Sequence, residues 1–331
     1  MQYAVFNRPV VTIYDLPCES KPDAEKGLLS TIGDEGLYGQ HCRVLTAPGG
    51  TTAQGENLPG DFTEILTFYG YHGYVHASQM IFLREDELLA HLASPRALLG
   101  RPTDVLASPV VQGFRYIGLE RGCTVRLADP DTRAIPQEGW AKVLLNDDTV
   151  GYVWAVSLQP VLYSEKALLH LDGSTRFDEA LSAGENIPAD QLVRAAVQKH
   201  FGGSEHAFRM ALIETAKNYM NTQYRWGGKS TRGIDCSGLT SSCYLQNGVL
   251  IYRDARIVEG WPVHTIPRAA MQPGDLLFFP GHIALYIGGG RYIHSTGNGK
   301  AGGVVINSLD PKAPDYRQEL DETMYAVGTV F

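Results

Sequence analysis

A weak internal repeat constrains the fold of the first half of this chain more than any other feature. Residues 62–67 lead into Gly73-Tyr74-Val75, and residues 140–145 lead into Gly151-Tyr152-Val153, which lies 78 positions further on. In both copies, short runs of β-forming residues are interrupted by Gly, Pro and Asp. The repeat predicts two small all-β barrels in succession.

The stretches that flank the repeat set the expected domain boundaries. Residues 85–92 have a helical pattern that Ser94-Pro95 interrupts, and the residues before Gly203 are polar and helical. From Ser204 onward helical and strand patterns follow one another, which is typical of an α+β domain. The expected organisation is a first β domain over 1–92, a second over 98–163, a helical linker over 164–203 and an α+β domain over 204–331.

The charge balance narrows the classes of partner. The chain has 28 Lys and Arg against 36 Asp and Glu, which gives a net charge of −8. This charge repels nucleic acid phosphates and anionic lipid headgroups, and no Lys/Arg cluster offsets it locally. The longest apolar runs, such as residues 276–279, fall far short of the roughly 18 residues that a membrane span needs. We expect a monomer with a peptide or small-molecule substrate, and no nucleic acid or membrane partner.

The N-terminus and the cysteines bear on location. Residues 1–9 lack the basic and apolar regions of a secretion signal, so a cytoplasmic protein is expected. A leader removed before Met1 would instead place the protein outside the cell or in its envelope. The five cysteines are odd in number and show no C-x-x-C spacing, which suits a reducing compartment and argues against a disulfide scaffold.

Cys236 stands where a nucleophile can be activated. Asp235 is a good N-cap and Gly248 a good C′ residue, so the spacing predicts a helix that begins at Cys236. The partial positive charge and the free amides of a helix N-terminus favour a thiolate, so we expect a thiol pKa below its usual value. Cys243, seven residues on along the same helix, is expected to be a core residue.

Two histidines follow on one predicted hairpin. Residues 282–287 and 291–295 read as strands joined by three glycines. With these glycines as the loop, His294 faces Ala284 and lies diagonal to His282 on the same face of the hairpin. The second histidine can therefore orient the first.

Together, these residues suit nucleophilic catalysis. Cys236 would attack, His282 would take its proton, and His294 would fix the tautomer of the base. Two alternatives remain open. The same three residue types bind zinc, although no fourth ligand is evident. A catalytically silent wall-binding protein, in which the β domains carry the function, is the other.

Five short motifs occupy the region from residue 204 to residue 331. In order they are Tyr224-Arg225-Trp226-Gly227-Gly228, Asp235-Cys236-Ser237-Gly238-Leu239, Pro273-Gly274-Asp275-Leu276-Leu277-Phe278-Phe279, Gly281-His282-Ile283-Ala284-Leu285-Tyr286-Ile287-Gly288 and Tyr292-Ile293-His294-Ser295. This set resembles the NlpC/P60 cysteine peptidases. The resemblance implies a papain-like α+β catalytic domain with Cys236, His282 and His294 as its triad and Tyr224 beside the thiol. It also implies that Asp235 and Ser237 line the substrate cleft, and it implies no cofactor.

Two stretches depart from the pattern of that family. The link Pro280-Gly281 before His282 is shorter than in many members, and residues 253–260 lack an expected glutamine. The shorter link means that the family pattern does not predict the depth of the substrate cleft beside His282. Neither changes the identity of the triad.

The order of the β domains and the catalytic domain extends the resemblance to the whole chain. Two SH3b-like domains ahead of an NlpC/P60 domain resemble γ-D-glutamyl-L-diamino acid endopeptidases, which trim peptidoglycan stem peptides with a free N-terminal L-Ala. The resemblance implies that Glu35 and Tyr71 hold the substrate ammonium. A buried ammonium needs a carboxylate partner, which agrees with that assignment. Recycling of imported peptides is the expected role, extracellular wall remodelling is the alternative, and the diamino acid stays open.

Overall fold

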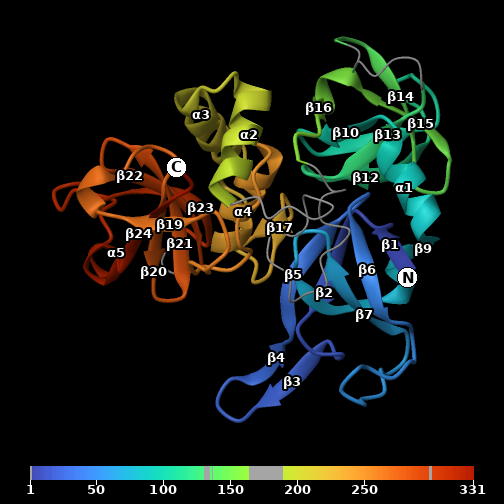
Figure 1. Cartoon of the computed structure of the whole chain (residues 1–331), viewed down its shortest axis with the longest axis horizontal. Coiled ribbons are helices and arrows are strands. Elements are labelled where there is room, and N and C mark those ends of the chain that lie inside the picture. The colour runs from blue at the N-terminus through green and yellow to red at the C-terminus, as the bar shows by residue number, and fades with distance from the viewer. Residues whose placement is uncertain (1, 130–134, 136, 164–188, 298–299) are drawn as a thin grey trace. The chain divides into compact units, whose positions relative to one another are not determined.

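The structure is a computed structural model of the chain (Figure 1), and it describes residues 2–129, 135, 137–163, 189–297 and 300–331. The chain divides into two compact units, Met1–Val161 and Leu162–Phe331. Among the helices that the structure describes, none has the length and apolar character to cross a bilayer.

Two seven-stranded antiparallel sheets make up the first unit. The strands of the first sheet are β1 (Gln2–Phe6), β2 (Val10–Tyr14), β5 (Ile32–Leu37), β6 (His41–Thr46), β7 (Phe62–Thr67), β8 (His72–His76) and β9 (Met80–Arg84), with a separate hairpin of β3 (Ser20–Asp23) and β4 (Gly27–Ser30). Those of the second are β10 (Arg96–Leu99), β11 (Thr103–Leu106), β12 (Arg115–Leu119), β13 (Thr124–Leu127), β14 (Trp140–Leu144), β15 (Val150–Trp154) and β16 (Leu158–Pro160).

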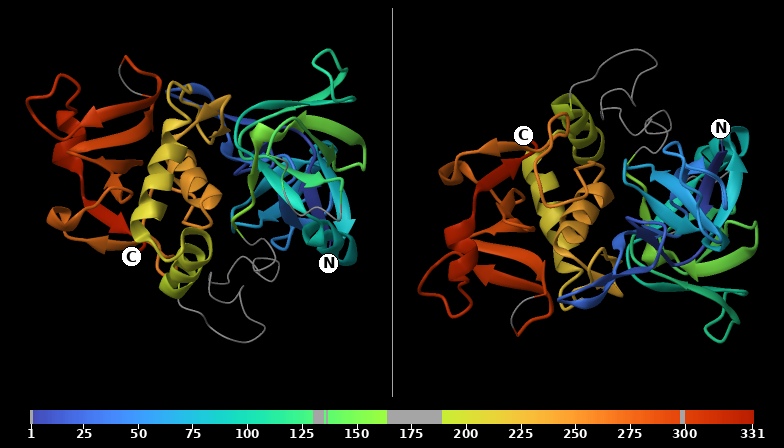
Figure 2. Two further views of the ribbon diagram at one scale, coloured as in Figure 1. Left: turned by 90° about the horizontal axis from the view of Figure 1, so that it is seen from above. Right: turned by 90° about the horizontal axis from the view of Figure 1, so that it is seen from below.

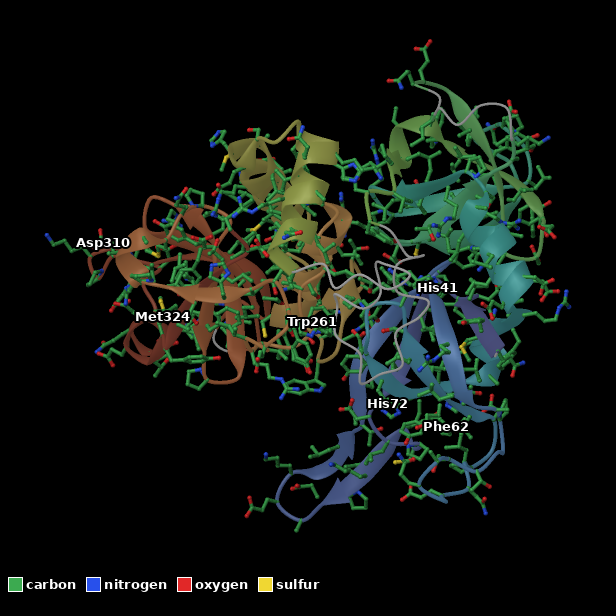
Figure 3. All side chains as sticks on the ribbon, in the orientation of Figure 1. His41, Phe62, His72, Trp261, Asp310 and Met324 are labelled. Atoms are coloured by element: carbon green, nitrogen blue, oxygen red, sulfur yellow. The ribbon has the colours of Figure 1, made fainter. Side chains whose placement is uncertain are left out.

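The two sheets have the same strand order. The first runs β5-β2-β8-β7-β6-β1-β9, and the second runs β12-β11-β15-β14-β13-β10-β16. One cross-strand pair of aromatic rings also repeats. Phe62 lies opposite His76 in the first sheet, and Trp140 lies opposite Trp154 in the second. Their ring centroids are 4.2 Å and 4.1 Å apart, and Phe62 is labelled in Figure 3. The prediction of two small SH3-like β domains is confirmed.

A short helix separates the two sheets along the chain. Helix α1 (Glu85–Ala93) has three acidic residues in its first turn, where they complement the helix dipole. It buries Leu88 and Leu92 and ends at Ser94, ahead of Pro95. The helical pattern read from residues 85–92 is therefore present in the structure.

The second unit is built on one six-stranded sheet of order β19-β24-β20-β21-β22-β23. Its strands are β19 (His264–Ile266), β20 (Leu276–Phe279), β21 (His282–Gly288), β22 (Arg291–Thr296), β23 (Gly303–Ser308) and β24 (Ala326–Thr329). Its helices are α2 (Ala189–Phe201), α3 (Glu205–Lys217), α4 (Cys236–Gln246) and α5 (Gln318–Thr323), and β17 (Lys229–Ser230) pairs with β18 (Gly233–Ile234). Figure 2 shows α3 and α4 on one side of the sheet.

Both faces of the sheet are buried, which explains why β20 is apolar at every position. Leu276 and Phe278 belong to the core cluster shared with α3 and α4. Leu277 and Phe279 belong to the cluster on the other face, against which Leu320 of α5 packs. A strand covered on both faces has no polar side to present to water. The α+β architecture of this unit is confirmed.

Helix α2 corrects part of the linker assignment. Val193 and Val197, on one face of α2, are buried in the same core cluster as Phe208 of α3. Residues 189–201 therefore belong to the packed second unit and are not a linker. The polar composition of this helix concealed a narrow apolar stripe. Residues 164–188 of the predicted linker lie outside the described residues.

A buried ion pair joins α3 to the sheet. The Arg209 guanidinium lies 2.7 Å from the Asp275 carboxylate, and their side chains are only 7% and 1% exposed. Arg209 also donates to the carbonyl of Pro273 and to the hydroxyl of Thr329. The pair therefore ties α3 to the segment before β20 and to β24.

We predict that Asp275→Ala destabilises the second unit by up to about 3–5 kcal/mol, because it removes the buried partner of Arg209 and leaves that charge with Glu205 alone, whose side chain is 44% exposed. Glu214→Ala is the matched control, since it removes an exposed i,i+3 pair with Lys217 and should change stability by under about 1 kcal/mol. Denaturant unfolding of both variants measures the difference. Equal stabilities would show that the buried pair does not hold α3 to the sheet.

Candidate active site

The helix that carries Cys236 begins and ends where its sequence predicts. Asp235 is the N-cap of α4, and its carboxylate accepts a hydrogen bond of 2.5 Å from the Gly238 amide. Asn247 closes the helix, and Gly248 follows with a φ of +90°, a left-handed conformation that glycine adopts without strain. Cys236 is thus the first helical residue and is 6% exposed. Cys243 is fully buried in the core, as predicted.

The motif ahead of the helix supports its first turn. The Gly228 carbonyl accepts from the Asp235 amide at 3.1 Å. It also lies so close to Gly238 that a Cβ there would come within 2.1 Å of it. Any larger residue at position 238 would push the helix away from this loop. Close packing against this loop therefore requires glycine at position 238.

The two histidines are in direct contact across β21 and β22. Nε2 of His282 lies 2.7 Å from Nδ1 of His294, with ring centroids 5.0 Å apart. Leu285 lies opposite Ile293, which is the predicted register. His294 is fully buried, whereas His282 is partly exposed.

The tip of this hairpin differs from the prediction. Gly288 pairs with Arg291, so Gly289 and Gly290 alone form the turn, both with positive φ. Ile287 is an extra residue that forms a bulge in β21. A two-residue turn of this hand matches the twist of the strands better than a three-residue loop. The bulge keeps the register at the histidines unchanged.

Hydrogen bonds bring the thiol to the start of β21. The amides of Ile283 and Ser237 both donate to the Cys236 sulfur. The Ser295 hydroxyl donates to the Ile234 carbonyl at 2.6 Å, which fastens the residue after His294 to the segment that precedes α4. The structure thus brings Cys236, His282 and His294 to one place where α4 meets β21 and β22.

Burial decides the protonation of these groups. It raises the pKa of the Cys236 thiol from 9.0 to about 11; the Asp235 charge also raises it, and the two amides and Arg253 oppose the rise. Burial lowers the pKa of His282 to about 3 and that of His294 to about 4. The expectation of a lowered thiol pKa is therefore wrong for this state. The loss of water around the sulfur outweighs the field of the helix N-terminus.

A neutral thiol beside a neutral imidazole defines the chemistry that the site can perform. His282 can accept the thiol proton as the sulfur attacks, so the charged pair forms during the reaction. The amides around the sulfur are free to stabilise negative charge as it develops. The arrangement is that of an acyl-transfer site.

Tyr224 lies beside this cluster. Its pKa is raised by burial first, and then by the charges of Cys236 and Asp235, so its hydroxyl keeps its proton. Its backbone is fixed by the Gly302 carbonyl, which accepts from the Tyr224 amide at 2.7 Å, and by a bridge to Ile234. The hydroxyl is available as a hydrogen-bond donor near the thiol.

Asp235 and Ser237 share a buried partner that the sequence did not reveal. The Arg253 guanidinium lies 3.2 Å from the Asp235 carboxylate and donates to the Ser237 hydroxyl at 2.7 Å. It also donates to the Gly227 carbonyl at 3.1 Å. Arg253 falls in the stretch that departs from the family pattern, and a charged residue there was the one available signal.

Asn307 is a second residue that sequence analysis missed. Its Oδ1 lies 2.8 Å from Nε2 of His294. It sits on β23 directly opposite Tyr292, the second residue before His294 on β22. Only the register of these two strands brings it to the histidine, and no local motif marks it.

Glu35 and Tyr71 belong to the first unit. Glu35 is 3% exposed on β5, beside the fully buried Asp34. The Tyr71 hydroxyl donates to the Asp15 carboxylate at 2.8 Å and lies against Gly33, two residues before Glu35. The Tyr71 hydroxyl therefore lies beside β5, two positions along that strand from Glu35.

The described residues contain no group of three or more His, Cys, Asp or Glu side chains placed to hold a metal ion. All five cysteines are free thiols. The zinc alternative therefore finds no ligand set in the part of the chain that the structure describes.

Comparison with known proteins identifies the class to which this fold and site belong. Residues 221–318 match the NlpC/P60 family. The chain is also 36% identical over 311 residues to dipeptidyl-peptidase 6 of Lysinibacillus sphaericus, covering 93% of this chain and 95% of that one. The chain belongs to the NlpC/P60 family and is a cysteine peptidase.

One further relative and one solved structure are also similar to this chain. A γ-D-glutamyl-L-lysine dipeptidyl-peptidase of Bacillus subtilis strain 168 is 38% identical over 98 residues, which are 27% of this chain and 33% of that one. A crystal structure of an NlpC/P60 family protein from Bacillus cereus ATCC 10987 matches with a TM-score of 0.63, at 19% identity and 98% coverage of both chains. The second match concerns the fold alone.

We predict that the rate of Cys236 alkylation by iodoacetamide rises steadily from pH 6 to pH 10 in the unliganded protein. A thiol with a pKa near 11 has about tenfold more thiolate for each unit of pH below that value. Peptide mapping by mass spectrometry separates Cys236 from the other four thiols. A rate that has already levelled off at pH 6 would indicate a thiolate formed in advance.

Proposed function

We propose that the protein hydrolyses the bond between the γ-carboxyl of D-Glu and an L-diamino acid in peptidoglycan stem peptides with a free N-terminal L-Ala, releasing L-Ala-D-Glu. The observation that carries the proposal is the contact of His282 with His294 beside the thiol at the start of α4. The names of the relatives, a dipeptidyl-peptidase over nearly the whole chain and a γ-D-glutamyl-L-lysine dipeptidyl-peptidase over part of it, support this substrate class.

The reaction begins with the thiol of Cys236. Its sulfur attacks the γ-carbonyl carbon while its proton passes to His282, and the carbonyl oxygen becomes an oxyanion. Backbone amides at the start of α4, assisted by the Tyr224 hydroxyl, hold this oxyanion, at about 3–4 kcal/mol for each donor. The C–N bond then breaks, and His282 returns the proton to the departing amine of the diamino acid.

The second half of the reaction frees the enzyme. The dipeptide is now joined to Cys236 as a thioester. His282 takes a proton from water as the water oxygen attacks the thioester carbon. The C–S bond breaks, L-Ala-D-Glu leaves with a free γ-carboxyl, and the sulfur recovers its proton from His282.

Recognition of the free amine is assigned to the first unit. A carboxylate that is 3% exposed, as Glu35 is, provides the charge that a desolvated ammonium needs. Tyr71 supplies a hydroxyl near the same strand, already oriented by Asp15. Asp235 and Ser237, held by Arg253, provide polar groups beside the scissile bond.

We place this activity in the cytoplasm, in recycling of imported stem-peptide fragments. The alternative is hydrolysis of intact peptidoglycan outside the cell, where the amine of L-Ala is joined to the glycan. Product analysis by mass spectrometry on free-amine peptides and on intact wall distinguishes the two roles. Release of peptides from intact wall at a comparable rate would favour the extracellular role.

We predict that Cys236→Ala abolishes release of L-Ala-D-Glu from a tripeptide ending in L-Lys or in meso-diaminopimelate, because no thioester can form. Cys243→Ala on the same helix is the matched control and should retain turnover, since Cys243 is a core residue about two helical turns beyond Cys236. Mass spectrometry of the products measures both. Full hydrolysis by Cys236→Ala would refute the mechanism.

We predict that Glu35→Gln raises KM for the free-amine tripeptide at least tenfold, because the substrate ammonium loses its counter-charge. Acetylation of the substrate amine should impair cleavage to a similar extent. Glu64→Gln is the control, since Glu64 is a buried carboxylate of the same sheet that bonds Thr46 and His72. Unchanged kinetics for both the Glu35 variant and the acetylated substrate would show that the first unit does not bind the substrate amine.

A further inference from the structure

A chain of three hydrogen-bonding side chains ends at the candidate base. Asn307 Oδ1 lies 2.8 Å from Nε2 of His294, and Nδ1 of His294 lies 2.7 Å from Nε2 of His282. Both ring nitrogens of His294 and Nε2 of His282 thus each face one partner. The choice of protonated ring nitrogen in one histidine therefore determines the choice in the other.

The backbone fixes which end of the Asn307 amide faces the histidine. Nδ2 of Asn307 donates to the carbonyl of Asp315 at 2.6 Å. That carbonyl also accepts from the Ser308 amide, and the Asp315 side chain is held by Arg291 at 2.6 Å. Turning the amide over would set two oxygens against each other, so Oδ1 must face His294. The loop that holds Asp315 follows β23 and is marked by Asp310 in Figure 3.

Both rings are neutral at physiological pH, so each carries one proton. Burial lowers the pKa of His282 and of His294, and the charge of Arg317 lowers both further. The hydrogen bond that His294 donates to Asn307 and the charge of Glu319 oppose the shift at His294, and Glu319 is itself paired with Arg317. With one proton on each ring, the acceptor at Asn307 decides where both protons lie.

We propose that Asn307 is a positioning residue that sets the tautomer of the catalytic base. Because Oδ1 only accepts, His294 must carry its proton on Nε2 and accept at Nδ1. His282 must then donate from Nε2, which leaves its Nδ1 as the basic nitrogen for the thiol proton. This inference rests on the proposed function for its catalytic meaning, but the tautomers themselves do not depend on it.

The structural test is the NMR spectrum of ring nitrogens in protein labelled with ¹⁵N-histidine, with signals assigned through His282→Gln and His294→Gln. In the wild type both rings should be protonated at Nε2. Asn307→Leu should abolish this single state at His294 and mix the tautomers of His282. Asn307→Gln keeps both the acceptor and the donor of a side-chain amide without adding a charge, and should preserve the wild-type tautomers. Unchanged tautomers in Asn307→Leu would overturn the proposal.

Kinetics of the same variants tests the consequence for catalysis. Asn307→Leu should lower kcat for the free-amine tripeptide at least about tenfold with little change in KM, since a misplaced ring proton removes the base. Asn307→Gln should stay within a few-fold of wild type. Asn218→Leu is the control, because it makes the same substitution at the exposed C-cap residue of α3.

The outcomes separate the two proposals. An equal loss of kcat in Asn307→Leu and Asn307→Gln with wild-type tautomers in both would show a purely structural role and overturn the inference. A wild-type protein that does not cleave the tripeptide would refute the proposed function, while the spectra would still decide the role of Asn307.

Discussion

The chemistry of this protein depends on the packing of one helix N-terminus against the central sheet. Asp235 and the loop carbonyl of Gly228 hold the first turn of α4, and the bond from Ser295 to Ile234 fastens that turn to β22. The same packing places the sulfur against the Ile283 amide, next to His282. A shift of this helix would separate the proposed nucleophile, Cys236, from its proposed base, His282, without altering either residue.

That packing has an electrostatic consequence. Removing water from the sulfur and from both rings favours their neutral forms, so the ground state holds no ion pair. Hydrogen bonds, instead of an ion pair, must then orient the base and stabilise the developing negative charge. We propose that the hydrogen bonds from His282 through His294 to Asn307 orient the base, and that the amides near the sulfur stabilise the charge that develops.

Local sequence patterns predicted those helices and strands that neighbouring residues in the chain determine. Asp235 and Gly248 bracket α4 because capping needs only nearby backbone, and the histidine register follows from strand alternation. The 78-residue repeat likewise predicted two sheets that share one strand order. The triad residues, Tyr224, Asp235 and Ser237 could therefore be proposed from sequence motifs alone.

Properties that arise from tertiary contacts could not be read in the same way. The raised thiol pKa comes from burial, which a capping motif does not report. Arg253 reaches Asp235 from 18 positions away, and Asn307 reaches His294 only through the pairing of β23 with β22. The docking of α2 through Val193 and Val197 was hidden by a mainly polar helix.

Trapping of an acyl-enzyme is the direct test of nucleophilic catalysis by Cys236. Wild-type protein mixed with the free-amine tripeptide is quenched in acid within milliseconds to seconds and then mapped by mass spectrometry. The account predicts L-Ala-D-Glu attached to Cys236 as a thioester that hydroxylamine releases. Product formation with no adduct at Cys236 at any time, or with the dipeptide on another residue, would contradict it.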